Sequence, residues 1–92
     1  MTHALKTWPE YYKAVESGEK TFEIRKMDRS FKVGDIVILQ EYELNGGGLS
    51  DDDLKGQYTG KELKRRVTYI LHGATSFGLV DDYCILGLKE IE

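Results

Sequence analysis

The feature that most narrowly limits the fold is a single helical segment followed only by strand-like stretches. Trp8, Tyr11, Tyr12 and Val15 recur at helical spacing, which predicts one amphipathic helix. Strand-like stretches separated by turn residues lie over residues 5–7, 21–25, 36–43, 58–71 and 83–89. Five or six strands and one helix within 92 residues predict a mainly β fold of the α+β kind, a small β-barrel plugged or flanked by its N-terminal helix.

Both ends of the predicted helix carry local signals. Thr7-Trp8-Pro9-Glu10 matches a capping box, with Thr7 at the cap, proline in the first turn and Glu10 three residues on. Gly18 occupies the position at which a left-handed residue ends a helix. We therefore expect a helix over residues 8–17 that is closed at both ends by its own sequence.

An octet of mixed charge, residues 18–25, follows directly and reads G-x-K-x-x-E-x-R. A strand through its second half puts Phe22 and Ile24 on one face and Glu23 and Arg25 on the other. We expect the apolar pair to enter the core. The two charged side chains should then face a cleft or solvent.

A carboxylate and a guanidinium on one strand face, with an ammonium at its entrance, indicate a polar ligand site. Arg25 offers a planar fork to a phosphate or carboxylate, and it is equally suited to pair with Glu23. Glu23 is suited to accept hydrogen bonds from a base edge. Lys20 joins them only if the chain is still turning at that residue. Otherwise, Lys20 points to the opposite face and is a solvated lysine.

Aromatic and basic residues elsewhere extend this candidate site. Trp8 is suited to stack on a nucleobase, although an aromatic residue beside a helix start is also typical of core packing; whichever of two adjacent tyrosines on the helix is not buried is a weaker stacking candidate. Candidate phosphate contacts are Lys26, Arg29, Arg65 and Arg66. The last two point to opposite faces of their strand, so only one of them can reach a common groove. A solvated strand edge is the alternative role for both.

The net charge of -3 argues against a generic, charge-driven nucleic-acid binder, but the charges are unevenly distributed. Residues 20–32 and 61–66 hold nine of the thirteen basic residues and only three acidic ones, a net charge of +6 for these segments. If the fold brings the segments together, one basic face could steer an anionic partner. The alternative is two solvated strand edges that Lys and Arg protect against aggregation.

Placed between helix and strand, the octet resembles that of ASCH domains (activating-signal-cointegrator homology), a branch of the PUA-like barrels. The similarity starts at Lys6-Thr7-Trp8-Pro9-Glu10 and runs through Val33-Gly34-Asp35. It continues in Tyr69-Ile70-Leu71 and Ile85-Leu86-Gly87-Leu88, so it covers most of the chain. The pattern is similar to that of an uncharacterised ASCH-like family of bacteria and phages.

This resemblance implies a cleft between helix and barrel, lined by Lys20, Glu23 and Arg25, and a binding module for RNA or a modified nucleotide. A small hydrolase is the main alternative, because some ASCH relatives are amidohydrolases of acylated cytidine and ribonuclease activity is associated with the superfamily. In those amidohydrolases a threonine nucleophile matches Glu23, and a lysine that activates it matches Lys20. Here glutamate replaces that hydroxyl, so the match to the amidohydrolases is poor at this position. A protein-interaction module is a further alternative.

Bulk properties limit the other classes. The length predicts one domain over residues 1–92. The longest mainly apolar stretch, Ile36–Leu39, is too short to span a membrane, and the N-terminal segment lacks the apolar part of a signal peptide, so we expect a cytoplasmic protein. A single cysteine, Cys84, excludes an internal disulfide and predicts a small apolar residue inside a strand. His3 and His72 lack companions at ligand spacing, so no metal is expected, and no motif calls for a cofactor.

Overall fold

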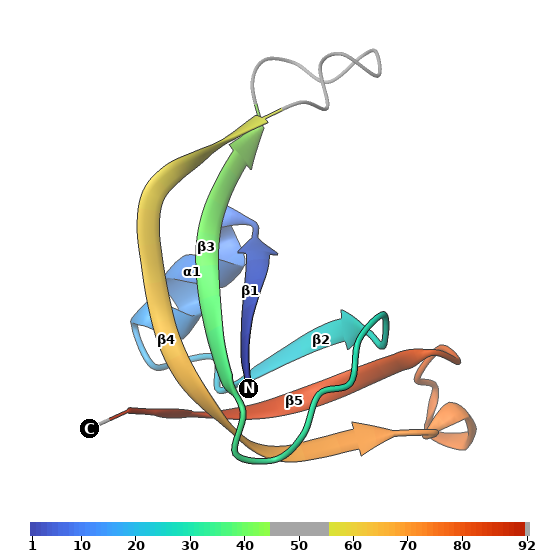
Figure 1. Ribbon diagram of the computed structural model, residues 1–92. Coiled ribbons are helices and arrows are strands. Elements are labelled where there is room, and N and C mark those ends of the chain that lie inside the picture. The colour runs from blue at the N-terminus through green and yellow to red at the C-terminus, as the bar shows by residue number, and fades with distance from the viewer. Residues whose placement is uncertain (45–55, 92) are drawn as a thin grey trace.

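The computed structural model describes residues 1–44 and 56–91. The elements within this part of the chain are β1 (Thr2–Thr7), α1 (Pro9–Glu16), β2 (Phe22–Lys26), β3 (Ile36–Leu44), β4 (Gly56–His72), the short 3-10 helix η2 (Thr75–Phe77) and β5 (Tyr83–Glu90) (Figure 1). The predicted strands and helix are therefore present. The glycine- and aspartate-rich loop that the sequence predicts between β3 and β4 lies outside the described residues from 45 to 55.

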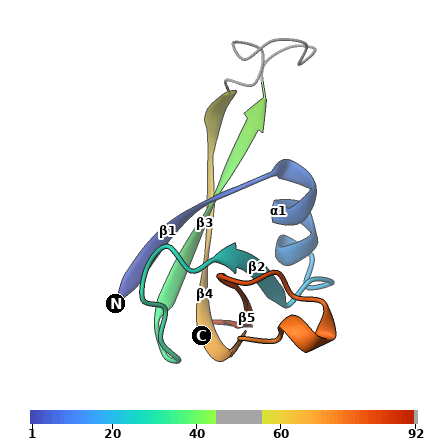
Figure 2. The ribbon, with the colours of Figure 1, turned by 90° about the vertical axis from the view of Figure 1, so that its right-hand side faces the viewer.

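The strands of the described residues form one five-stranded sheet in the order β1-β3-β4-β5-β2. β1 runs parallel to β3, and the other neighbours are antiparallel. β4 is long and strongly bent, so its first part pairs with β3 and its last part with β5, with a register irregularity between Val67 and Tyr69. The sheet thereby curls into an open half-barrel with β1 and β2 at its edges (Figures 1 and 2). The predicted barrel-like, mainly β fold with one helix is confirmed in this open form.

The core lies on the concave side of the sheet, where α1 packs against β3. Burial in this core stabilises the fold by about 1.5–3 kcal/mol for each large apolar side chain. Its members come from every strand except β2, from the helix and from the loop before β3: Leu5, Tyr12, Val15, Phe31, Val37, Leu39, Val67, Cys84, Leu86 and Leu88. Cys84 is thus the buried strand residue that the sequence predicts.

The start of α1 differs from the capping-box prediction. Trp8, not Thr7, is the N-cap, and among the residues that the structure describes no side chain makes a capping hydrogen bond to the start of the helix. Thr7 is instead the buried last residue of β1, and its hydroxyl donates to the Leu5 carbonyl at 3.2 Å. The predicted end is confirmed, because Gly18 has a φ of 87° directly after the last turn. The longest helix in the described ranges, α1, has eight residues, far short of the roughly 20 that cross a bilayer.

The expected orientation of β2 is wrong. Phe22 and Ile24 are 41% and 52% exposed, whereas Glu23 is only 4% exposed and lies on the concave side. The reason is the pairing with β5, where Glu23 is the register partner of the buried Leu86. Residues directly opposite each other in a ladder share a face, so β5 fixes which side of β2 points inward.

Side chains bridge the seam between the two sheet edges, β1 and β2. Arg25 Nη2 donates to the Lys6 carbonyl at 2.6 Å, and Arg29 Nη1 donates to the Ala4 carbonyl at 3.4 Å. These carbonyls belong to the edge strand β1, whose other side pairs with β3. The arginines therefore satisfy backbone acceptors that a closed barrel would satisfy with a neighbouring strand.

Candidate functional site

Three side chains of the octet meet on the concave side of β2. The buried Glu23 accepts a hydrogen bond from Lys20 Nζ at 2.6 Å through Oε1, and its Oε2 lies 3.5 Å from Arg25 Nε. Lys20 reaches this face because it precedes the strand, and its backbone N–H still donates to the Ala14 carbonyl of α1. The chain is therefore still turning at Lys20, which is the condition under which the sequence predicts that Lys20 joins the site. We call Lys20, Glu23 and Arg25 the charged cluster.

Arg25 is held in place by β1. Its Nη2 donates to the Lys6 carbonyl and, at 3.3 Å, to the Thr7 hydroxyl. Its Nε is buried and has no hydrogen-bond partner among the described residues. Leaving a buried donor without a hydrogen bond is costly. The guanidinium is therefore fixed in position while one of its donors still lacks an acceptor.

Two aromatic rings lie beside the charged cluster. Trp8 and Tyr11 are 44% and 45% exposed, whereas the adjacent Tyr12 is buried. Trp8 is therefore not a core residue, and Tyr11 is the tyrosine that remains open to solvent. The Lys20 ammonium lies 5.0 Å from the centre of the Tyr11 ring, within the range of a cation–π contact.

Two hollows between α1 and β2 border the charged cluster. One, of about 190 Å³, is lined by Lys6, Thr7, Trp8, Tyr11, Glu23, Ile24 and Arg25. The other, of about 290 Å³, is lined by Tyr11, Lys20, Phe22, Glu23 and Ile24. Because three lining residues are common to both, we treat the two hollows together as the cleft. Lys20, Glu23, Arg25 and Trp8, the predicted ligand residues, all line it.

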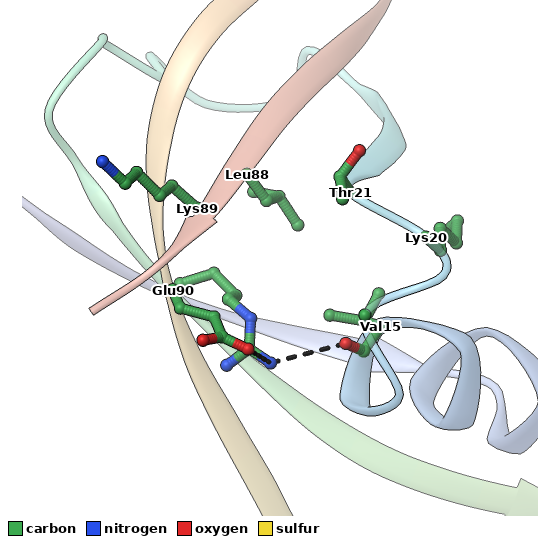
Figure 3. Close-up of a pocket in the computed structure, with 8 residues that line it drawn as sticks. Val15, Lys20, Thr21, Leu88, Lys89 and Glu90 are labelled. Atoms are coloured by element: carbon green, nitrogen blue, oxygen red, sulfur yellow. Dashed lines mark hydrogen bonds and ion pairs between the residues drawn. The ribbon is translucent and has the colours of Figure 1, made fainter. Parts of the chain in front are cut away.

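A third hollow, of about 330 Å³, lies between the end of α1 and the end of β5 (Figure 3). Its lining includes Lys20, Thr21 and Arg65. Arg65 Nη2 donates to the Val15 carbonyl at 3.4 Å and lies 4.0 Å from Glu90. The Lys20 ammonium, as described above, is hydrogen-bonded to Glu23.

The basic residues proposed as phosphate contacts are dispersed. Arg65 points to the concave side and shares the third hollow with Lys20, so each basic segment contributes one cation there. Arg66 is exposed on the opposite face, as predicted for adjacent strand residues. Lys26 is exposed on β2, and Arg29 lies beside Asp28 at 3.2 Å and at the seam.

Sequence reasoning missed the contributions of β1. Lys6 and Thr7 line the cleft and anchor Arg25, and only their place in the ASCH-like stretch pointed toward them. Sequence reasoning also missed the buried pair His3 and Asp35, whose Nε2 and Oδ2 atoms lie 2.8 Å apart. The hydrogen bond with His3 holds the pKa of Asp35 at about 2, against an ordinary 3.8. This pair fastens the start of β1 to the turn before β3, away from the cleft.

Comparison with known proteins gives a family but no activity. A protein of Escherichia phage P2, described as "Uncharacterized 12.9 kDa protein in GpA 3'region", is 32% identical over 66 residues, which are 72% of this chain and 50% of the phage protein. The chain thus spans about half the length of that relative. The model of the family described as "Domain of unknown function (DUF3850)" matches residues 2–88, which include the charged cluster, the cleft and all of the half-barrel except the end of β5. The chain therefore belongs to the DUF3850 family.

Proposed function

We propose that this protein is a binding module for RNA or a modified nucleotide, with the ligand held in the cleft, and that its fold is of the ASCH, PUA-like type. The observation that carries the proposal is the convergence of the charged cluster with two half-exposed aromatic rings, Trp8 and Tyr11, around one cleft. Fixed charges supply orientation and open rings supply stacking area, which are the two requirements of nucleotide recognition.

The aromatic part of the cleft suits a base. Stacking on an aromatic side chain contributes about 1–3 kcal/mol per base, and both rings present nearly half of their surface to solvent. The two hollows, of about 190 and 290 Å³, together reach the lower part of the range of small-molecule pockets, about 300–1,000 Å³. A single nucleotide is therefore a ligand of suitable size.

The charged part of the cleft suits a phosphate. Lys6, Lys20 and Arg25 line it against one carboxylate, Glu23, which is buried and already accepts a hydrogen bond from Lys20. The excess of positive charge, and an Arg25 Nε that lies in the ion pair with Glu23 but makes no hydrogen bond among the described residues, favour an anionic group with acceptor oxygens. Glu23 then serves to position the two cations of the cluster.

Trp8 is the only tryptophan of the chain, so its fluorescence tests the proposal directly. Nucleoside monophosphates and short single-stranded RNAs should change this fluorescence in a saturable way and shift the amide resonances of Lys20, Glu23 and Arg25. Added salt should weaken binding, because phosphate contacts release counterions. No spectral change at millimolar ligand would end the proposal.

Two alanine variants provide a matched comparison. Tyr11→Ala removes a cleft ring and should weaken binding roughly 5- to 100-fold, the equivalent of one stacking contact. Phe77→Ala removes an aromatic ring that is 89% exposed in η2, away from the cleft lining, and should leave affinity unchanged. Equal losses in both variants would contradict a base on Tyr11.

The same protein tests the hydrolase alternative. Incubation with acylated cytidine, and separately with RNA, should leave both substrates intact, because Lys20 is hydrogen-bonded to Glu23 instead of a nucleophilic hydroxyl. Turnover that is lost on replacing Lys20 with methionine would favour an enzyme over a binding module.

A further inference from the structure

The convex side of strands β2, β5 and β4 carries an apolar and aromatic surface that the cleft does not account for. α1 lies on the other side of these strands (Figures 1 and 2). Register pairs align two rows across the three strands, the first formed by Phe22, Gly87 and Tyr69 and the second by Ile24, Ile85 and Leu71. Tyr69 is 65% exposed, and Phe22 and Ile24 are about half exposed. Contiguous apolar surface of this kind marks interaction sites on soluble proteins.

Cations flank the pair of rows on both sides, in the direction along the strands. Lys26 pairs with Tyr83 at one end, and Arg66 pairs with Lys89 at the other. We call these four residues and the two rows the outer face. Every charged residue of the outer face is a cation, in a chain with a net charge of -3. Beside Arg66 and Lys89 lies a hollow of about 250 Å³, whose lining also includes Glu90.

The centre of the outer face is open because Gly87 has no side chain. Phe22 and Tyr69 flank it on the two neighbouring strands, and adjacent strands lie about 4.8 Å apart. A Cβ atom on Gly87 would lie 3.2 Å from Thr68 Oγ1 and 3.4 Å from Tyr69 Cβ. Glycine therefore keeps the surface between the two rings free for a flat group to lie on.

We propose that the outer face is a second binding surface, for single-stranded RNA, with bases stacked on Phe22 and Tyr69 and phosphates bound by Lys26 at one end and by Arg66 and Lys89 at the other. Aromatic rings within a cationic border are the combination that binds single strands. The choice of RNA rests on the proposed function, because Phe22 and Ile24 also line the cleft. A single RNA molecule can thus run from the cleft, around the edge of the sheet at β2, to the outer face.

The charges also disfavour a second copy of the chain as the occupant. Two outer faces packed together would bring cations against cations in either direction, since Lys26 lies at one end and Arg66 with Lys89 at the other. Like charges in contact are unfavourable. A polyanion with flat bases, in contrast, matches both the ends and the centre of the face.

Fluorescence anisotropy of a labelled single-stranded RNA of about ten nucleotides tests the inference. Tyr69→Ala should weaken its binding roughly 5- to 100-fold, as expected for one stacked base. The double variant Arg66→Gln with Lys89→Gln should also weaken binding and reduce the dependence of affinity on salt. Neither variant should change the Trp8 fluorescence titration with a mononucleotide, which reports the cleft alone.

Matched controls separate the outer face from general effects. Phe77→Ala removes an exposed ring outside the face, and Lys13→Gln removes an exposed lysine of α1. Both should bind the ten-nucleotide RNA as the unaltered protein does. The glutamine variants keep the inference testable if Tyr69→Ala fails to fold.

The possible results either support or overturn the inference. It is overturned if the RNA does not bind, if the outer-face variants bind it unchanged, or if single-stranded DNA of the same length binds equally well or more tightly. It is also overturned if sedimentation shows a dimer that Tyr69→Ala dissociates, which would assign the face to a second copy. RNA affinity that depends on Tyr69, with no mononucleotide bound near Trp8, would support the outer face and reject the cleft.

Discussion

Replacement of Lys20 by methionine should destabilise the fold through the carboxylate that it leaves behind. Methionine keeps the length of the side chain but removes the donor that lies 2.6 Å from Glu23 Oε1. The Glu23 side chain is 5% exposed and, within the described part of the chain, would retain only Arg25 Nε, at 3.5 Å, as an ion-pair partner. A buried carboxylate that loses its main partner is one of the few causes of large destabilisation by a single substitution.

The structure limits the expected magnitude from both sides. At 2.6 Å and an effective dielectric constant of about 20, the attraction amounts to about 6 kcal/mol before desolvation opposes it. Exposed pairs retain about 0.2–1 kcal/mol, and breaking a fully buried pair costs about 3–5 kcal/mol. Because Lys20 is 17% and Glu23 is 5% exposed, we expect Lys20→Met to lower the free energy of unfolding by about 2–3 kcal/mol.

Urea unfolding at neutral pH, followed by far-UV circular dichroism, measures this loss, and a double-mutant cycle isolates the pair. Glu23→Gln should cost less than Lys20→Met, about 1–2 kcal/mol, because the freed ammonium can move into water. The double variant should cost less than the sum by about 1–2 kcal/mol. Lys13→Met, on an exposed lysine of α1, should stay within about 0.5 kcal/mol of the unaltered protein. Additive losses, or a Lys20→Met effect as small as the control, would refute the reasoning.

Three further outcomes are expected. The His3 hydrogen bond lowers the pKa of Asp35 from 3.8 to about 2. The contribution of Asp35 to stability is therefore present above 3.8 and lost as the pH falls toward about 2, and urea unfolding across this window should change less in Asp35→Asn than in the unaltered protein. Gly18→Ala should lower thermal stability by about 1 kcal/mol, because φ at this position is 87°; an unchanged melting temperature would contradict this. Burial raises the pKa of the Cys84 thiol, so a thiol reagent should label the native protein far more slowly than the urea-unfolded chain.

Features with a local cause could be predicted from the sequence. The end of α1 could be predicted because it depends on a few neighbouring residues, here the left-handed Gly18. The strands could be predicted because they form where the local residues favour extended backbone. Lys20 and Glu23 are three residues apart, so their meeting depends only on how the chain turns into β2. The barrel-like, mainly β fold followed from the number and order of such elements.

Features decided by distant pairing could not be predicted in the same way. Alternation shows that Phe22 and Ile24 share a face. Which face of β2 turns inward is decided by its pairing with β5, far along the chain. The predicted Thr7 cap failed because pairing with β3 extends β1 through that residue. The bond between Arg25 and the Lys6 carbonyl likewise needs the curled sheet that brings β1 and β2 to a common seam.

The choice of which face of β2 turns inward is hard to explain by stability alone. Full burial of Phe22 and Ile24 would stabilise the fold by about 1.5–3 kcal/mol each, whereas buried ion pairs such as that of Glu23 contribute little net stability. The chain nevertheless turns Glu23 and Arg25 inward and leaves the apolar pair about half exposed. A local departure from the apolar-inside pattern is typical of functional surfaces. One register choice thus accounts for both proposed surfaces, because β2 turns Glu23 and Arg25 inward to the cleft, while Phe22 and Ile24, at the rim of the cleft, begin the outer face.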